Sequence, residues 1–79
     1  MKDLLKYIIS SIVEKSDEVD IEESETDGVT NYTISVAKED MGRVIGKSGK
    51  VIRAIRNTMR IAAMKANKKI YINLSENPL

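Results

Sequence analysis

The sequence predicts one α+β domain in which three helices cover one face of a small three-stranded sheet. Three observations lead to this fold class: a helical apolar pattern at the N-terminus, two alternating segments separated by a turn, and a helical region followed by a last alternating segment. The predicted order is α-β-β-α-α-β. It occupies residues 1–79 as a single domain, near the lower size limit at which one hydrophobic core maintains a fold.

A first helix is predicted from about residue 2 to 15. Its apolar residues recur at the spacing of an amphipathic helix: Leu4, Leu5, Ile8, Ile9, Ile12 and Val13. Because charges and Ser10-Ser11 interrupt the run and no small-residue cleavage site follows, we interpret it as part of the fold rather than as a signal peptide. No segment approaches the length of a membrane span, so we expect a cytoplasmic protein with no membrane partner.

An acidic hairpin is predicted over about residues 18–38. Its first strand alternates Val19 and Ile21 with acidic residues, which predicts one buried and one solvated face. Asp27-Gly28 is typical of a tight hairpin turn. The second strand has three apolar residues at period two: Tyr32, Ile34 and Val36.

Two helices and a last strand are predicted after the hairpin. A short helix runs from Met41 to about Ile45, with Asp40 placed to cap its start, and a longer helix runs from about Lys50 to Ala66. Together they are long enough for a right-handed crossover between two strands of one sheet. The last strand, about residues 69–75, again alternates apolar with polar or aromatic residues; its apolar members are Ile70, Ile72 and Leu74.

Charge is divided sharply along the chain. The net charge is only +1, but residues 14–40 carry ten acidic and two basic residues, a local charge of −8, whereas residues 41–69 carry nine basic residues and no acidic one, a local charge of +9. This division predicts a basic face for a polyanion and an acidic face elsewhere. The alternative interpretation is that the two halves attract each other within the fold.

The chain contains no cysteine and no histidine. Their absence excludes disulfides, Cys/His zinc sites and the nucleophile–histidine pairs of many hydrolases. The carboxylates are abundant, but they alternate along a hairpin instead of converging in an apolar pocket. We therefore expect no catalytic activity, no cofactor and no metal site.

The segment MGRVIGKSGKVIRAIR, residues 41–56, holds three of the four glycines. It is similar to a nucleotide-binding P-loop, but only three residues separate Gly42 from Gly46 where that motif needs four. A helix, rather than a buried strand, is also expected before it. Two glycines that bracket two polar residues let a phosphodiester chain approach the main chain closely, and the positive end of the following helix attracts it.

The segment VIGKSGKVIRAIR resembles the signature of KH domains, in which a Gly-x-x-Gly loop clamps four nucleotides of a single strand. The pattern Ile-Gly-x-x-Gly-x-x-Ile is met at Ile45, Gly46, Gly49 and Ile52. Together with the element order, this resemblance implies the type II KH fold, a mixed sheet whose last strand lies parallel to the strand before the loop. The whole chain resembles the small stand-alone bacterial KH proteins of the KhpA type, with Ser16-Asp17 in place of a frequent Asn-Pro.

The resemblance implies single-stranded RNA binding with modest sequence preference and leaves binding of single-stranded DNA open. Proteins of this type associate with themselves and with a larger KH-containing partner of the KhpB/Jag type, and they are linked to cell elongation and small-RNA biology. A homodimer is therefore expected. The candidate RNA-binding residues are Arg43, Ile45, Gly46, Lys47, Ser48, Gly49, Lys50 and Arg53.

Several of these residues have an ordinary structural interpretation beside the functional one. Lys50, Arg53, Arg56 and Arg60 fall within about 120° of one helix face, which can follow phosphates or be a solvated surface. Arg60 is more than two turns from the loop and is not included in the site. The isoleucines at 45, 52 and 55 are expected mainly in the core, although the KH resemblance also places Ile45 in the floor of the base-binding groove. Gly42 is expected to serve close helix packing.

Two other features leave alternatives open. Only three aromatic residues are present, all tyrosines, so base stacking is not expected to be the main source of affinity. The methionines at 41, 59 and 64, with the alanines at 62, 63 and 66, fill the core or form an adaptable dimer interface. The alternative function is a protein-interaction adaptor or dimerisation scaffold that uses the acidic hairpin, residues 17–27.

Overall fold

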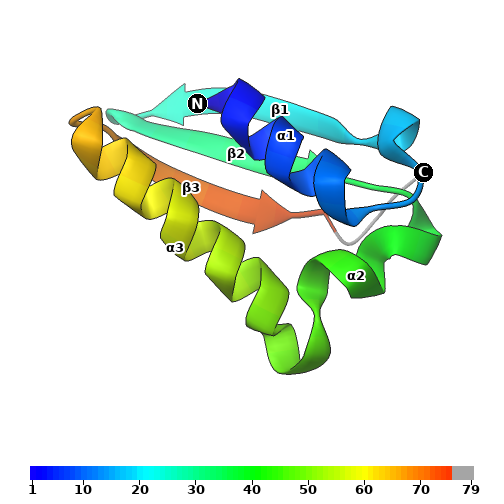
Figure 1. Ribbon diagram of the computed structural model, residues 1–79. Helices are drawn as coiled ribbons and strands as arrows, with labels where there is room; N and C mark the ends of the chain where they lie inside the picture. Colours follow the sequence, from blue (N-terminus) through cyan, green and yellow to red (C-terminus); the bar gives the residue numbers. More distant parts are fainter. Residues whose placement is uncertain (76–79) are drawn as a thin grey trace.

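In the computed structural model, which describes residues 1–75, three helices and three strands follow one another in the predicted order (Figure 1). The elements are α1 (Lys2–Ile12), β1 (Asp20–Thr26), β2 (Val29–Ser35), α2 (Met41–Ile45), α3 (Lys50–Lys65) and β3 (Lys69–Leu74). Short 3-10 turns precede β1, α2 and α3 at Ser16–Glu18, Lys38–Asp40 and Lys47–Gly49.

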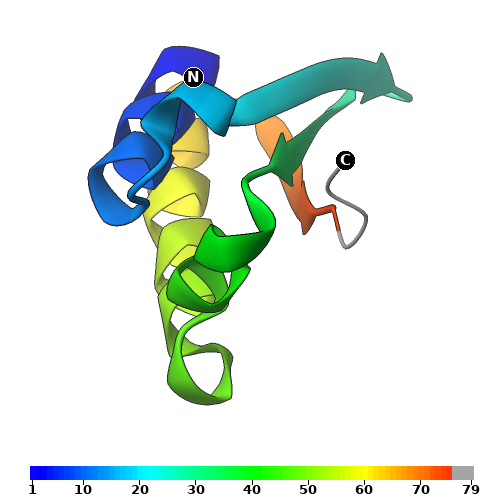
Figure 2. The same ribbon diagram turned by 90° about the vertical axis from the view of Figure 1, so that its right-hand side faces the viewer.

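The sheet is mixed, with the strand order β1-β2-β3. β1 and β2 pair antiparallel through a turn at Asp27-Gly28, where both residues have positive φ (52° and 79°), as the tight hairpin turn favoured by Asp-Gly requires. β2 and β3 pair parallel, with Val29 opposite Lys69 and Ile34 opposite Leu74. Figure 2 shows all three helices on the same side of the sheet. The predicted α+β fold class is confirmed.

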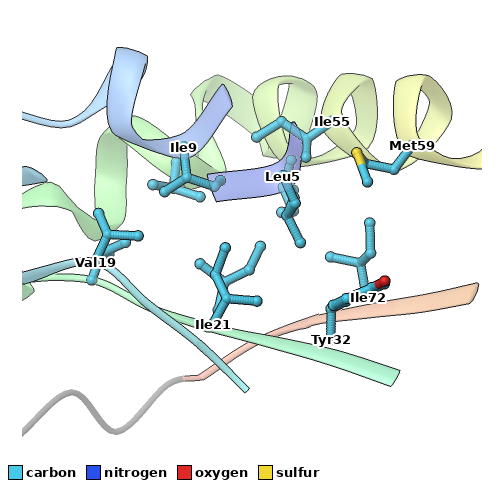
Figure 3. Packing of buried hydrophobic residues seen from close by; sticks show 12 residues of the cluster. Leu5, Ile9, Val19, Ile21, Tyr32, Ile55, Met59 and Ile72 are labelled. Atoms are coloured by element: carbon cyan, nitrogen blue, oxygen red, sulfur yellow. The ribbon is translucent and has the colours of Figure 1, made fainter. Parts of the chain in front are cut away.

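The hydrophobic core lies between the sheet and the helices. Figure 3 shows Leu5 and Ile9 of α1 and Met59 of α3 pointing toward the sheet residues Ile21 and Tyr32. All five side chains are buried. Met59 and Ala63 both lie in the core, so these two residues fill the core and do not form a dimer interface. Met64, by contrast, is 72% exposed. Removing one of the largest of these side chains costs about 2–5 kcal/mol by the usual cavity argument.

The structure differs from the prediction at the end of the first helix. α1 ends at Ile12, not near residue 15, and Val13 is extended with φ −89° and ψ 159°. The reason is a distant acceptor: the backbone N–H groups of Glu14 and Lys15 donate to the carboxylate of Asp40 at 3.1 and 3.0 Å. Asp40 does occupy the N-cap position of α2, but its side chain does not cap that helix. The expected cap was therefore wrong.

Candidate nucleic-acid interface

The loop Gly46–Gly49 joins α2 to α3 at the lower edge of the molecule in Figure 1, away from the sheet. Three of its four residues have positive φ: Gly46 (75°), Ser48 (58°) and Gly49 (74°). The N–H of Gly46 donates to the carbonyl of Gly42 at 2.9 Å, and the N–H of Gly49 donates to the carbonyl of Gly46 at 3.1 Å. The loop is therefore a tight, hydrogen-bonded reversal and not an open linker.

The two loop glycines are needed for different reasons. A Cβ built at Gly46 would lie 2.3 Å from Cγ2 of Val51 and 2.8 Å from its backbone nitrogen, so Gly46 packs against the first turn of α3. A Cβ built at Gly49 would meet nothing within 4 Å, so Gly49 is needed only for its backbone conformation. The space beside Gly49 leaves the main chain open to a ligand.

The start of α3 is suited to an anion. Gly49 is the N-cap residue, and the first turn of the helix contains no acidic residue. The side chains of Lys47, Ser48 and Lys50 are exposed around it. The N–H groups of Gly49 and Lys50 already donate to the carbonyls of Gly46 and Lys47. The positive end of the 16-residue helix faces the same region as two lysines and a hydroxyl.

The basic face is not neutralised by the acidic hairpin. Among the described residues, only Arg43 of the nine basic residues between 41 and 69 forms an ion pair. Lys50, Arg53, Arg56 and Arg60 are exposed along α3. Their charges remain available to a ligand, which favours the polyanion interpretation over attraction between the two halves.

Arg43 lies in a different environment from the other candidates. Its Nη2 is 2.7 Å from Oε1 of Glu14, and its Nε is 3.5 Å from Oδ1 of Asp40. These contacts direct its guanidinium toward the segment after α1. The structure thus brings Lys47, Ser48, Lys50 and Arg53 together around the loop, and it places Arg43 beside a pair of carboxylates.

Asp40 is the one buried charged residue among those described, with 1% of its surface exposed. Two backbone N–H groups, of Glu14 and Lys15, hold its pKa below the usual value, and the positive charges of Arg43 and Lys15 act in the same direction. It therefore fixes the start of α2, and through α2 the loop, to the segment after α1. The sequence analysis missed this role because both main partners are backbone groups about 25 positions away.

Ile45 corrects another expectation. Val44 is fully buried in the core, but Ile45 is 38% exposed immediately before the loop, so placing Ile45 mainly in the core was wrong. Ile52 and Ile55 are buried as predicted. An apolar side chain thus lies at the surface beside the loop backbone, where the KH resemblance expects the floor of a groove.

The described residues show neither a membrane-spanning helix nor a metal-binding cluster. None of the helices in residues 1–75 is long and apolar enough to cross a membrane. The same residues contain no group of three or more His, Cys, Asp or Glu side chains placed to hold a metal ion.

The order of the elements, the parallel last strand and the Gly-x-x-Gly loop between two helices define a type II KH domain. The family model described as "KhpA/KhpB, KH domain" matches residues 2–74. The chain belongs to this family.

Curated relatives agree over nearly the whole chain. The chain is 39% identical over 77 residues to "RNA-binding protein KhpA" of Chlamydia caviae, covering 98% of this chain and 99% of the relative. It is 41% identical over 76 residues to the protein of the same name from Listeria monocytogenes, covering 96% and 100%. For the Clostridium acetobutylicum protein of that name, the identity is 40% over 74 residues, covering 94% and 99%.

Proposed function

We propose that this protein is a non-catalytic module that binds single-stranded RNA by clamping its backbone at Gly46–Gly49, with modest sequence preference. The observation that carries the proposal is the combination at the start of α3: a tight glycine loop, open space beside Gly49, and basic side chains without acidic partners. The relatives are named RNA-binding proteins, which supports RNA as the polyanion.

Each candidate residue has a distinct role in this proposal. Gly46 and Gly49 shape the loop and allow the backbone of the RNA to approach, and Ser48 donates a hydrogen bond to a phosphate oxygen. Three basic side chains, of Lys47, Lys50 and Arg53, neutralise phosphates. Ile45 contacts a base through its exposed apolar surface. Arg43 flanks the site and, through Glu14 and Asp40, holds α2 in place.

The proposal is tested with the double substitution Lys47→Asp/Ser48→Asp, measured by fluorescence anisotropy with labelled single-stranded RNA at two salt concentrations. We expect salt-sensitive binding by the wild type and no binding by the double variant, because three units of charge change at the loop. A matched control, Lys2→Asp/Ser24→Asp, makes the same charge change at exposed positions on α1 and β1. If the folded loop variant binds RNA as tightly as the wild type, the loop is not the clamp. The same measurement with single-stranded DNA of the same sequence gives the preference for RNA over DNA.

The same proposal has three further parts. The protein associates with itself, it pairs with a larger KH-containing protein of the KhpB/Jag type, and it acts in the cytoplasm in RNA regulation linked to cell elongation. Large apolar side chains on the helical side remain exposed, among them Leu4 (42%) and Ile61 (58%). A domain this small that leaves such side chains in water is suited to bury them against another protein. Sedimentation velocity over a range of concentrations tests the homodimer, and a single monomeric species throughout would exclude it.

A second candidate function is a protein-interaction adaptor that uses the acidic hairpin. The carboxylates of Glu22, Glu23 and Glu25 are exposed on β1 and form no ion pair with a described lysine or arginine. A partner protein that co-purifies after nuclease treatment and a high-salt wash would support this function. Loss of that partner when the three glutamates are changed to glutamine would place the contact on the hairpin.

A further inference from the structure

The outer edge of β1 lies on the opposite side of the sheet from β3. β1 is the first strand in the order β1-β2-β3, so one of its edges has no neighbouring strand. Figure 1 shows this edge at the top of the sheet, with no described strand beyond it. Every residue of β1 except Ile21 is exposed. With seven residues, β1 is long enough to pair with another strand, since strands usually have about five or six.

The register of the hairpin shows which backbone groups face this edge. In an antiparallel pair, opposite residues alternate between hydrogen-bonded and non-hydrogen-bonded pairs. Ile34 lies opposite Ile21, and its carbonyl accepts a hydrogen bond at 2.8 Å from the N–H of Ser75, which directly follows β3. Because the backbone of Ile34 bonds toward β3, the N–H and C=O of Ile21 face the free edge. At period two, those of Glu23 and Glu25 do the same.

The side chains along this edge are acidic on both faces of the strand. Side chains alternate along a strand, so Glu23 and Glu25 lie on the same face as the buried Ile21, and Glu22 lies on the opposite, open face. These three glutamates form no ion pair with a lysine or arginine in the described part of the chain. The edge therefore combines outward-facing peptide groups with negative charge that the fold does not neutralise.

The charge decides which kind of strand this edge can pair with. A second copy of this chain would bring one acidic β1 against another, and like charges directly opposite each other destabilise a pair of strands. Charged side chains commonly protect a free edge against such pairing in this way. RNA, being a polyanion, is repelled for the same reason. A strand rich in lysine or arginine is not repelled and forms cross-strand ion pairs.

We propose that the free edge of β1 binds an extended segment of a partner protein that is rich in lysine or arginine and that adds to the sheet as a fourth strand. The peptide groups of Ile21, Glu23 and Glu25 supply the main-chain hydrogen bonds, and the glutamates select the charge. The inference rests on the second candidate function, the adaptor, and adds the chemistry of its partner and the mode of binding. The Gly46–Gly49 loop takes no part in this contact.

The first test uses a synthetic peptide of alternating lysine and valine, capped at both ends and seven residues long like β1. One control peptide has glutamate in place of lysine, and a second keeps the lysines but is N-methylated at every residue, so that it cannot donate main-chain hydrogen bonds. Fluorescence anisotropy of the labelled peptides measures binding to the full chain. We expect salt-sensitive binding of the lysine peptide and binding at least about tenfold weaker for both controls.

Variants of the protein separate the charge from the backbone. The triple substitution Glu22→Gln/Glu23→Gln/Glu25→Gln removes the charge and should weaken binding of the lysine peptide by about tenfold or more. Glu23→Pro removes an N–H that faces the free edge, where proline is tolerated, and should weaken binding to a similar extent with the domain still folded. Glu22→Pro is the matched control, because it removes an N–H that faces β2 and should lower the unfolding temperature.

Hydrogen exchange of the backbone amides, followed by NMR, gives a readout that attraction between charges alone does not change. In the free protein, the N–H groups of Glu23 and Glu25 face water and should exchange quickly, whereas those of Glu22 and Ser24 face β2 and should be protected. A saturating amount of the lysine peptide should slow exchange at Glu23 and Glu25 by about tenfold or more.

Slowed exchange at Glu23 and Glu25, together with weaker binding of the N-methylated peptide, would support the fourth strand. If the lysine peptide binds through the glutamates but the N-methylated peptide binds equally well and exchange is unchanged, strand addition is wrong and the acidic hairpin remains a contact surface for an adaptor. Absence of binding by the lysine peptide, or equal binding of the glutamate peptide, would overturn the inference. None of these results bears on RNA binding, which the loop variant tests separately.

Discussion

Replacing Gly46 with alanine tests the account of the loop at its tightest point. Gly46 has φ 75° and ψ 172°, a backbone conformation found almost only in glycine. The added Cβ would also lie 2.3 Å from Cγ2 of Val51 and 2.8 Å from the Val51 nitrogen, distances at which atoms must move apart. Because the Val51 nitrogen belongs to the first turn of α3, relieving the clash would displace the backbone of that helix.

The cost can be worked out in two parts. Holding a non-glycine residue in this conformation costs about 1–3 kcal/mol. Forcing a methyl group into a packed contact costs about 1–3 kcal/mol more. The free energy of unfolding of Gly46→Ala should therefore fall by about 2–6 kcal/mol, a large share of the stability of a small domain.

Gly49→Ala is the matched control, because Gly49 also has positive φ (74°) but its Cβ would meet open space. Its cost should be only the conformational part, about 1–2 kcal/mol. Urea unfolding followed by far-UV circular dichroism measures both variants. We expect Gly46→Ala to be less stable than Gly49→Ala by at least about 1 kcal/mol. Equal stability of the two variants would refute the inferred contact between Gly46 and Val51.

Two further predictions concern charge. Asp40→Asn leaves one of the Glu14 and Lys15 N–H groups facing an NH₂ group, so this variant should be less stable than the wild type at neutral pH. In the folded protein the pKa of Asp40 is lower than its usual value of 3.8, so the ionised carboxylate stabilises the fold at pH values above 3.8. This stabilisation is lost as the pH falls through the lowered pKa. Urea unfolding at several pH values should therefore show a larger acid loss in the wild type than in Asp40→Asn, and parallel losses would contradict the role of the carboxylate. Lys50→Ala and Arg53→Ala should each leave the unfolding temperature unchanged. Each should reduce the magnitude of the slope of log affinity for RNA against log salt concentration by about 0.7. An unchanged slope would show that the substituted residue does not contact a phosphate.

The sequence predicted the parts of this fold that depend on local pattern. The order of helices and strands follows from apolar periodicity, and the hairpin turn follows from the positive φ that Asp27-Gly28 accommodates. The basic face of α3 follows from residue spacing on a regular helix. Each of these signals lies within a few residues of the sequence, so it does not depend on contacts between distant segments.

The missed features are all contacts between distant segments. The early end of α1 depends on Asp40, whose partners at Glu14 and Lys15 are far away in the sequence. Whether Ile45 or Val44 faces the core depends on how the five-residue helix α2 is rotated against α1 and α3, and its short pattern does not determine that rotation. The hydrogen bond from Nε of Arg56 to the carbonyl of Ile72 likewise exists only because the crossover places β3 beside α3.

The most direct test of the central claim is to follow the backbone amide signals of the labelled protein by NMR while single-stranded RNA is added. If the loop clamps the RNA backbone, the largest shifts will occur at Gly46–Gly49 and at the first residues of α3, with the hairpin β1–β2 unchanged. If RNA binds but the largest shifts lie on the hairpin or on α1 while the loop amides stay in place, the assignment of the loop as the clamp is wrong.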